Sequence, residues 1–166
     1  MPATYEPIAT QTLASAASSI TFSSIAASWT DLRVVFIDNG LSVADRPVMQ
    51  FNGDTGTNYS ATRITGTGGA AGSTTTTNDN QIRFQNSNLE ATYPSLLTVD
   101  IFSYAGSTNK TVLGMQSDDG NGTGGIYVAV GLWRNTAAIT SIVIKTISGN
   151  NFLTGTTATL YGIKAA

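Results

Sequence analysis

The chain has 166 residues, with no His, no Cys and charged side chains at only 11% of its positions. Without Cys it can form neither a disulfide framework nor a thiolate metal site. With a formal net charge of −2 it lacks the basic surface that neutralises phosphates. We therefore expect a protein that works by shape and contact, with no enzymatic activity, no cofactor and no nucleic-acid partner.

Short segments rich in Thr, Val, Ile, Tyr and Phe dominate the chain, and they either alternate with polar residues or are apolar throughout. A period of two predicts β-strands. In chain order, the predicted strands are 5–13, 18–23, 31–37, 47–51, 59–64, 81–84, 96–104, 110–116, 125–133, 140–147 and 157–163. Eleven strands require two sheets.

The segments between the strands contain turn residues. Gly, Asn and Asp, which tolerate a positive φ, occur at 38–40, 52–54, 119–122 and 148–151. The Ala-rich segment 11–19 carries three Ser, so we expect one helical turn there at most. Segments 66–80 and 118–125 predict projecting loops, the first because Gly and Ala give way to four consecutive Thr.

Many short strands separated by turns predict a single all-β domain over 1–166, built as a two-sheet antiparallel β-sandwich. We favour a jelly roll of two four-stranded sheets, with the extra strands as arms or edge additions and an N-terminal arm at 1–16. Few Lys residues protect the predicted edges, which favours pairing with other chains.

The chain shows neither a signal peptide nor a membrane span. Its first residues lack a basic segment followed by an apolar one, and no apolar run approaches the ~18 residues that cross a bilayer. We therefore expect no membrane partner.

The acidic residues give little support for catalysis or metal binding. Most Asp residues lie in turns, where their side chains hydrogen-bond nearby backbone NH groups. Paired catalytic carboxylates are therefore not indicated. Calcium is an alternative use of the oxygen-rich segments 52–56 and 118–121, but neither has the spacing of an EF-hand. We expect turns at both, and no metal site.

Exposed aromatic side chains would indicate a glycan-binding platform. The candidates are Trp29, Trp133, Tyr59, Tyr93 and Tyr127. Because side chains alternate along a strand, Tyr127 and Trp133 share one face of the strand 125–133 with Ala129 and Gly131. Such a face is more often core or subunit contact than a sugar platform.

Several segments resemble small virion proteins of tailed bacteriophages. They are YEPIATQTL at 5–13, ITFSSI at 20–25, FNGDTGTNYS at 51–60, NF at 151–152 and GTTATLYGI at 155–163. Similar segments occur in tail-fibre, head-decoration and other structural proteins of phages that infect cyanobacteria and other aquatic bacteria. The resemblance implies a place in the virion, and it brings no catalytic residues with it.

Two functions follow from this resemblance. The first is a capsid decoration or cement protein on the head surface, which binds the major capsid protein and stabilises the shell. We expect it to be a homo-oligomer, with a trimer favoured because shells have local three-fold positions. The alternative is a tail-fibre or receptor-binding domain that recognises a host surface polysaccharide. In either case the contact regions we predict are 5–13, 66–80 and 118–125.

Overall fold

The structure is a computed structural model that describes residues 5–85 and 91–164. Within these residues it contains twelve strands and no helix. The strands, in chain order, are β1 (Tyr5–Thr12), β2 (Ser19–Phe22), β3 (Asp31–Asp38), β4 (Pro47–Phe51), β5 (Tyr59–Thr67), β6 (Ala70–Asp79), β7 (Ile82–Arg83), β8 (Ser95–Phe102), β9 (Lys110–Asp118), β10 (Gly125–Trp133), β11 (Ile142–Thr146) and β12 (Thr157–Ile163).

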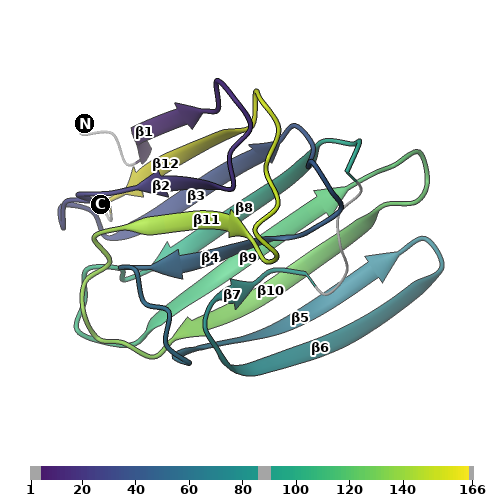
Figure 1. The fold of residues 1–166 in the computed structure, drawn as a ribbon. Helices are drawn as coiled ribbons and strands as arrows, with labels where there is room; N and C mark the ends of the chain where they lie inside the picture. Colours follow the sequence, from purple (N-terminus) through teal and green to yellow (C-terminus); the bar gives the residue numbers. More distant parts are fainter. Residues whose placement is uncertain (1–4, 86–90, 165–166) are drawn as a thin grey trace.

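The strands form two sheets of unequal size that lie face to face (Figure 1). The larger sheet has eight strands in the order β1-β12-β3-β8-β9-β10-β5-β6, and the smaller has four in the order β2-β11-β4-β7. All neighbouring strands are antiparallel. The all-β, two-sheet antiparallel sandwich is therefore confirmed. The expected division into two four-stranded sheets is wrong, and the jelly-roll connectivity stays a prediction.

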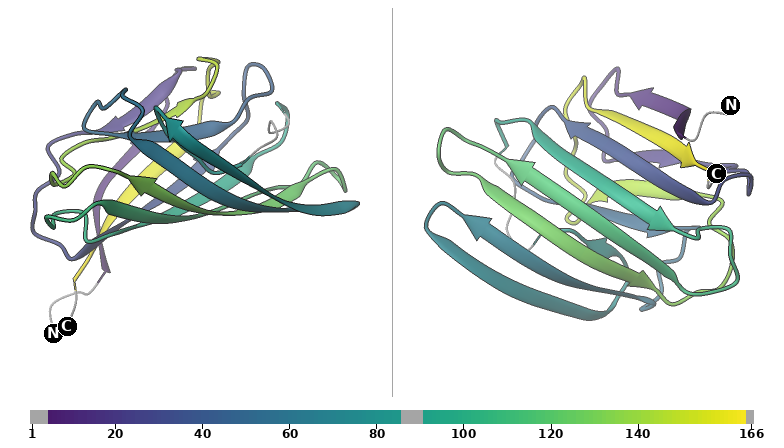
Figure 2. Two further views of the ribbon diagram at one scale, coloured as in Figure 1. Left: turned by 90° about the horizontal axis from the view of Figure 1, so that it is seen from below. Right: turned by 180° about the vertical axis from the view of Figure 1, so that it is seen from behind.

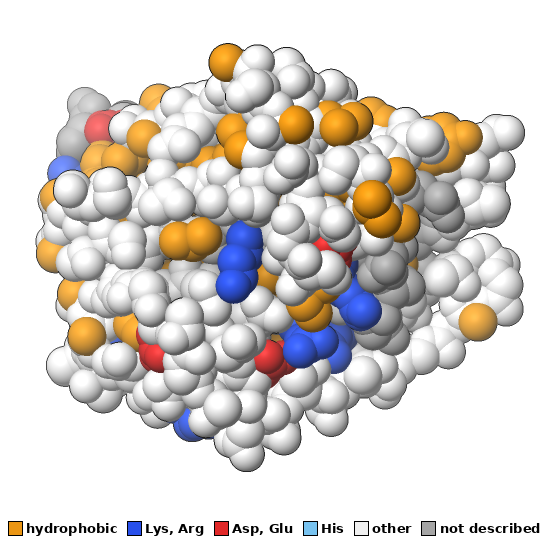
Figure 3. Space-filling model, in the orientation of Figure 1, with side chains coloured by type: hydrophobic (Ala, Val, Ile, Leu, Met, Phe, Trp, Pro, Cys, Tyr) orange, Lys and Arg blue, Asp and Glu red, His pale blue; other side chains and the backbone are white. Residues whose placement is uncertain are grey.

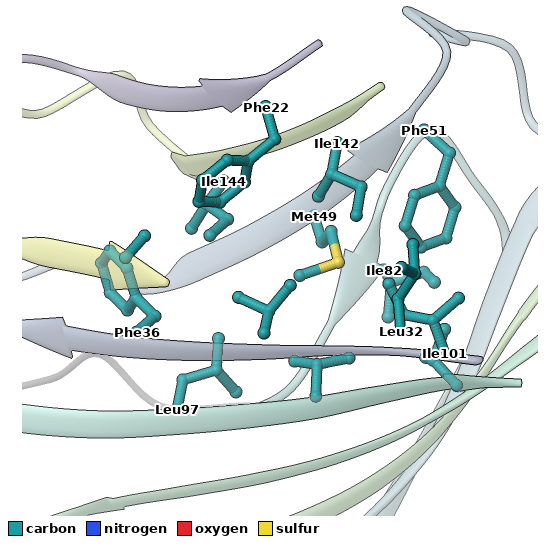
Figure 4. Close-up of a cluster of buried hydrophobic side chains, with 14 of the residues drawn as sticks. Phe22, Leu32, Phe36, Met49, Phe51, Ile82, Leu97, Ile101, Ile142 and Ile144 are labelled. Atoms are coloured by element: carbon teal, nitrogen blue, oxygen red, sulfur yellow. The ribbon is translucent and has the colours of Figure 1, made fainter. Parts of the chain in front are cut away.

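One core lies between the two sheets. Alternate residues of β3 (Leu32, Val34 and Phe36) point inward and are fully buried. They lie opposite side chains of the smaller sheet, among them Met49 and Ile144 (Figure 4). Fully burying a side chain of this size stabilises the fold by ~1.5–3 kcal/mol, so the inward faces of the two sheets hold the sandwich together.

The predicted loop at 66–80 is largely a strand. Residues 70–79 form β6, which pairs with β5 as an edge strand of the larger sheet, and the two strands are joined at Gly68 and Gly69. The prediction gave too much weight to the Gly and Ala residues. Thr is β-branched and favours strands, so the run of Thr continues the hairpin after a glycine turn.

The helical turn allowed for at 11–19 does not form. β1 ends at Thr12, Ala17 makes an isolated bridge with Phe152, and β2 begins at Ser19. The expected loop at 118–125 is shorter than predicted, because β9 extends to Asp118 and β10 starts at Gly125.

Most of the predicted N-terminal arm belongs to the larger sheet. Residues 5–12 form β1, which pairs antiparallel with β12, and the register shifts between Pro7 and Ala9. The ring of Tyr5 stacks on Tyr161, with 4.7 Å between the ring centroids. Residues 1–4 of the arm lie outside the described residues. The view from behind (Figure 2, right) shows β1 at one edge of the sheet and the β5–β6 hairpin at the other.

Candidate functional site

The larger sheet has a second face that no other element of the described residues covers. The smaller sheet packs against one side of it, and in the view from behind (Figure 2, right) the strands of the larger sheet lie in front. We call this surface the outer face and define it by the outward side chains of β3, β8, β9, β10 and β5. A half-buried antiparallel sheet normally carries polar residues on its solvent side, so its composition is informative.

The outer face is apolar. The described residues include twelve exposed large hydrophobic side chains, and eight of them lie on this face, each between 38% and 63% exposed. They are Ile37, Leu96, Phe102, Leu113, Met115, Ile126, Val130 and Ile64. Soluble monomers rarely expose a large contiguous apolar patch unless it is a binding surface.

Strand register places these side chains next to one another. Met115 lies opposite Val128, which in turn lies opposite Ile64 on the next strand. Val130 is the cross-strand partner of Leu113, and Ile37 is the partner of Leu96. Directly opposed residues have Cβ atoms only ~5 Å apart. The exposed side chains therefore lie on five adjacent strands, with polar residues interspersed where β8 meets β9, since Thr98 lies opposite Met115 and Asp100 opposite Leu113.

The charge within this surface is nearly balanced. Arg33 on β3 donates two hydrogen bonds to Asp100 on β8, at 2.5 and 2.8 Å. The hydrogen bonds to Asp100 raise the pKa of Arg33, so this guanidinium stays charged. Asp31, the remaining charged outward residue of β3, accepts a hydrogen bond from the backbone NH of Ser103.

Other charged side chains gather on the opposite side of the molecule, over the smaller sheet (Figure 3). Arg83 on β7 pairs with Asp79 there, and Lys145 lies on β11. The outer face therefore combines exposed hydrophobic side chains with a single ion pair, Arg33–Asp100.

A hollow of about 920 Å³ lies at one end of the outer face. Ile37, Leu96 and Ile126 contribute apolar side chains to its wall, while Asp118 and Asp119 are among its polar residues. The predicted contact loop after β9 and the turn of the β5–β6 hairpin both contribute to it. An open apolar hollow of this kind can receive side chains of another protein.

The calcium candidate at 52–56 is a structural turn. Asp54 Oδ2 accepts hydrogen bonds from Trp133 Nε1 at 2.7 Å and from Asn58 Nδ2 at 2.9 Å, and its Oδ1 accepts one from the Gly56 NH. Desolvation raises the pKa of Asp54, but these three hydrogen bonds outweigh it and leave the pKa lowered. Both carboxylate oxygens are therefore already used within the fold.

The second calcium candidate also uses its carboxylates locally. Asp119 Oδ1 accepts a hydrogen bond from the Gly122 NH at 2.8 Å, and Asp118 Oδ1 accepts one from the Gly125 NH at 3.2 Å. Across residues 5–85 and 91–164, no three acidic side chains come close enough together to hold a metal ion. The arrangement is that of a tight connection between β9 and β10.

The aromatic candidates do not form a glycan platform. Trp133 and Tyr59 are 0% exposed and stack on each other in the core, with 6.2 Å between ring centroids. Tyr127 is also buried, as the alternation along β10 predicts. Trp29 packs over Gly162, and Tyr93 is exposed beside Gly120. Among the described residues, the aromatic candidates therefore lie mostly inside or far apart.

Two buried cations, Lys110 and Arg63, donate hydrogen bonds within the fold. Lys110 is 0% exposed, and its Nζ donates hydrogen bonds to the carbonyl oxygens of Gly106, Thr108 and Thr136. Arg63 is 3% exposed and donates to Thr76 and to the carbonyl of residue 83. Through these hydrogen bonds both cations hold loops and strands in place.

Sequence reasoning did not identify the outer face, although a signal for it was present. Segments 96–102, 111–116 and 126–133 carry apolar residues at both odd and even positions. A strand that is apolar on both sides is typical of a sheet covered on both faces. Within residues 5–85 and 91–164, only one face of this sheet is covered by the smaller sheet.

No protein-family model matches this chain, and a search of curated proteins finds no relative of it. No helix among the described residues is long and apolar enough to cross a membrane.

Proposed function

We propose that this chain is a structural protein of a tailed-phage particle, and that it acts as a capsid decoration or cement protein on the head. The observation that carries the proposal is the uncovered apolar outer face. A surface of this kind fits contact with protein, because apolar area in water is stabilised by burial against another apolar surface. The segment resemblance supports the virion as the place where that contact is made.

A decoration protein of this kind stabilises a shell by multivalent contact. An oligomer that binds several capsid subunits at once raises the free-energy cost of releasing any one of them. The sequence favours a trimer at local three-fold positions, and this stays a prediction. The low net charge indicates that binding depends on fitted surfaces and is only weakly sensitive to salt.

The hollow beside Asp118 and Asp119 favours the second candidate function, a tail-fibre or receptor-binding domain. Carboxylates and backbone groups around an apolar hollow could hydrogen-bond a polysaccharide. The burial of Trp133 and Tyr59 speaks against it, because these rings cannot stack on a sugar from inside the core. We therefore keep it as the alternative.

We also propose that the chain has jelly-roll connectivity. In this interpretation, the three consecutive strands β8, β9 and β10, which lie between β3 and β5 in the larger sheet, take the place of one jelly-roll strand. A jelly roll joins two sheets through two Greek keys. The order β2-β11-β4-β7 supports this, as does the repeated passage of the chain between the two sheets. β1 and β12 are then additions at one edge.

The proposed function is tested by locating the protein on purified particles. An antibody raised against the full chain should label the head densely in immunogold electron microscopy. The protein band from purified virions should correspond to on the order of hundreds of copies, as one copy at each local symmetry position requires. Label at the tail tip would favour the alternative, and label on neither head nor tail would contradict both functions.

A further inference from the structure

We propose that the outer face is a self-association surface, on which a second copy of this chain packs its own outer face. This inference rests on the proposed function, in which the outer face contacts another protein. It identifies that protein as a second copy of this chain. Two sheets that pack face to face lie ~10 Å apart and interdigitate their side chains. The pair would be a four-layered body with the two outer faces at its centre.

The whole uncovered side of the larger sheet, which is the outer face together with the flanking strands β1, β12 and β6, has enough area for a stable dimer. Eight strands spaced ~4.8 Å apart, each rising ~3.3 Å per residue over about eight residues, give a sheet face of ~1,000 Å². Stable protein dimers bury ~800 Å² on each partner. The apolar side chains span five adjacent strands at the centre of the sheet, from Ile37 on β3 to Ile64 on β5. The apolar core of the contact would therefore be ringed by the more polar edge strands.

The charge of the outer face permits contact with an identical surface. Arg33 and Asp100 neutralise each other within one chain, so two copies can meet with little repulsion. The five central strands carry no outward Lys or Glu, the residues that commonly prevent sheets from associating. An isologous contact between two such faces closes on itself, because the same patch is used on both partners.

A polysaccharide or a lipid surface fits the outer face less well. Its exposed side chains are mainly aliphatic, with Phe102 as the one aromatic residue among the eight, so it offers little for sugar rings to stack on. It also lacks the Lys and Arg cluster that anionic lipid attracts. This two-fold dimer differs from the trimer expected from shell symmetry. A measurement of the molecular mass in solution distinguishes the two.

The test uses the purified full chain in light scattering and sedimentation equilibrium over a range of concentrations. The wild type should have twice the 17.2 kDa mass of one chain. Ile126→Asp and Met115→Asp, at positions 61% and 53% exposed, should fold normally and weaken the pair at least ~30-fold, as loss of an interface hot spot does. Val43→Asp is the matched control, because Val43 is 57% exposed but lies outside the outer face, and it should remain a pair.

A wild type that stays at the mass of one or three chains at all concentrations would overturn the inference. So would a pair that survives both outer-face substitutions while circular dichroism confirms their fold. These outcomes are independent of particle location. A monomeric chain that still labels phage heads would leave the proposed function intact, whereas a stable pair that labels no particle would leave only the self-association standing.

Discussion

The indole Nε1 of Trp133 donates a 2.7 Å hydrogen bond to Oδ2 of Asp54, which joins the end of β10 to the turn after β4. This hydrogen bond involves one residue of each of two sites that the sequence offered, the aromatic glycan platform and the calcium turn at 52–56. Trp133 is a core residue whose polar atom is satisfied inside the protein, and Asp54 is the acceptor that satisfies it. Both residues therefore have a structural role in the fold.

Replacement of Asp54 should therefore destabilise the fold. In Asp54→Ala, Trp133 Nε1 and the Asn58 amide lose their acceptor, and an unsatisfied buried donor costs ~1–3 kcal/mol. Urea unfolding should show a loss of about 2 kcal/mol. Asp119→Ala, in the exposed loop, should change stability by less than ~0.5 kcal/mol. A melting temperature that rises in calcium for the wild type and not for Asp54→Ala would show that the turn is a metal site after all.

Lys110→Met should be strongly destabilising. The ammonium group supplies hydrogen bonds to three carbonyl oxygens of two different loops, and Met of similar length supplies none. Loss of such a buried charged donor costs ~3 kcal/mol. The matched control is Lys145→Met on β11, which is partly exposed and should lose less than ~0.5 kcal/mol. Equal losses of unfolding free energy in the two variants would contradict the structural role assigned to Lys110.

Asp38 should give the unfolding free energy a pH dependence. Its side chain is 1% exposed, and Oδ2 has no hydrogen-bond partner. Desolvation raises the pKa of Asp38 to about 6, despite hydrogen bonds from the Gly40 NH and the Thr156 hydroxyl. Between pH 4 and 6 the folded state then binds more protons than the unfolded state, so stability falls as pH rises.

The loss attributable to Asp38 should be ~2 kcal/mol between pH 4 and 7. It should be absent in Asp38→Asn, which cannot titrate, and retained in Asp119→Asn. Denaturant unfolding at several pH values measures the difference between the curves. Identical pH slopes for the wild type and Asp38→Asn would mean that Asp38 does not carry a raised pKa.

Gly114 on β9 allows Phe84 to pack against the larger sheet. A Cβ at this position would overlap the ring of Phe84, so Gly114→Ala should cost ~1–3 kcal/mol by overpacking. Gly68→Ala, where a Cβ meets nothing within 4 Å, is the control. The double variant Gly114→Ala with Phe84→Leu should lose less than the sum of the two single losses. Strict additivity would show that the two residues do not compete for this space.

Local patterns in the sequence predicted most strands and the inward face of β10. The alternation of Tyr127, Ala129, Gly131 and Trp133 is a property of neighbouring residues, so it could be read without knowing their partners. β6 was missed because the Gly and Ala residues at its start obscure the strand preference of the Thr residues that follow, and because its conformation also depends on pairing with β5.

The interactions that decide the site join residues far apart in the chain. Trp133 and Asp54 are 79 positions apart, and Arg33 and Asp100 are 67 apart. No local pattern specifies such pairs. The outer face was in part predictable, because several strands carry apolar residues at both odd and even positions. The sequence could not show which of the two faces of the larger sheet the smaller sheet leaves uncovered.

Oxidation of Met115 tests the central claim, that the outer face is a protein-contact surface, most directly. Met115 is 53% exposed in the isolated chain, and Met49 in the core is 0% exposed and serves as an internal reference. Peroxide converts accessible Met to the sulfoxide, and mass spectrometry gives the rate at each position. In intact purified particles, Met115 should oxidise nearly as slowly as Met49, while in the purified Ile126→Asp variant it should oxidise rapidly. Rapid oxidation of Met115 in intact particles would contradict the account.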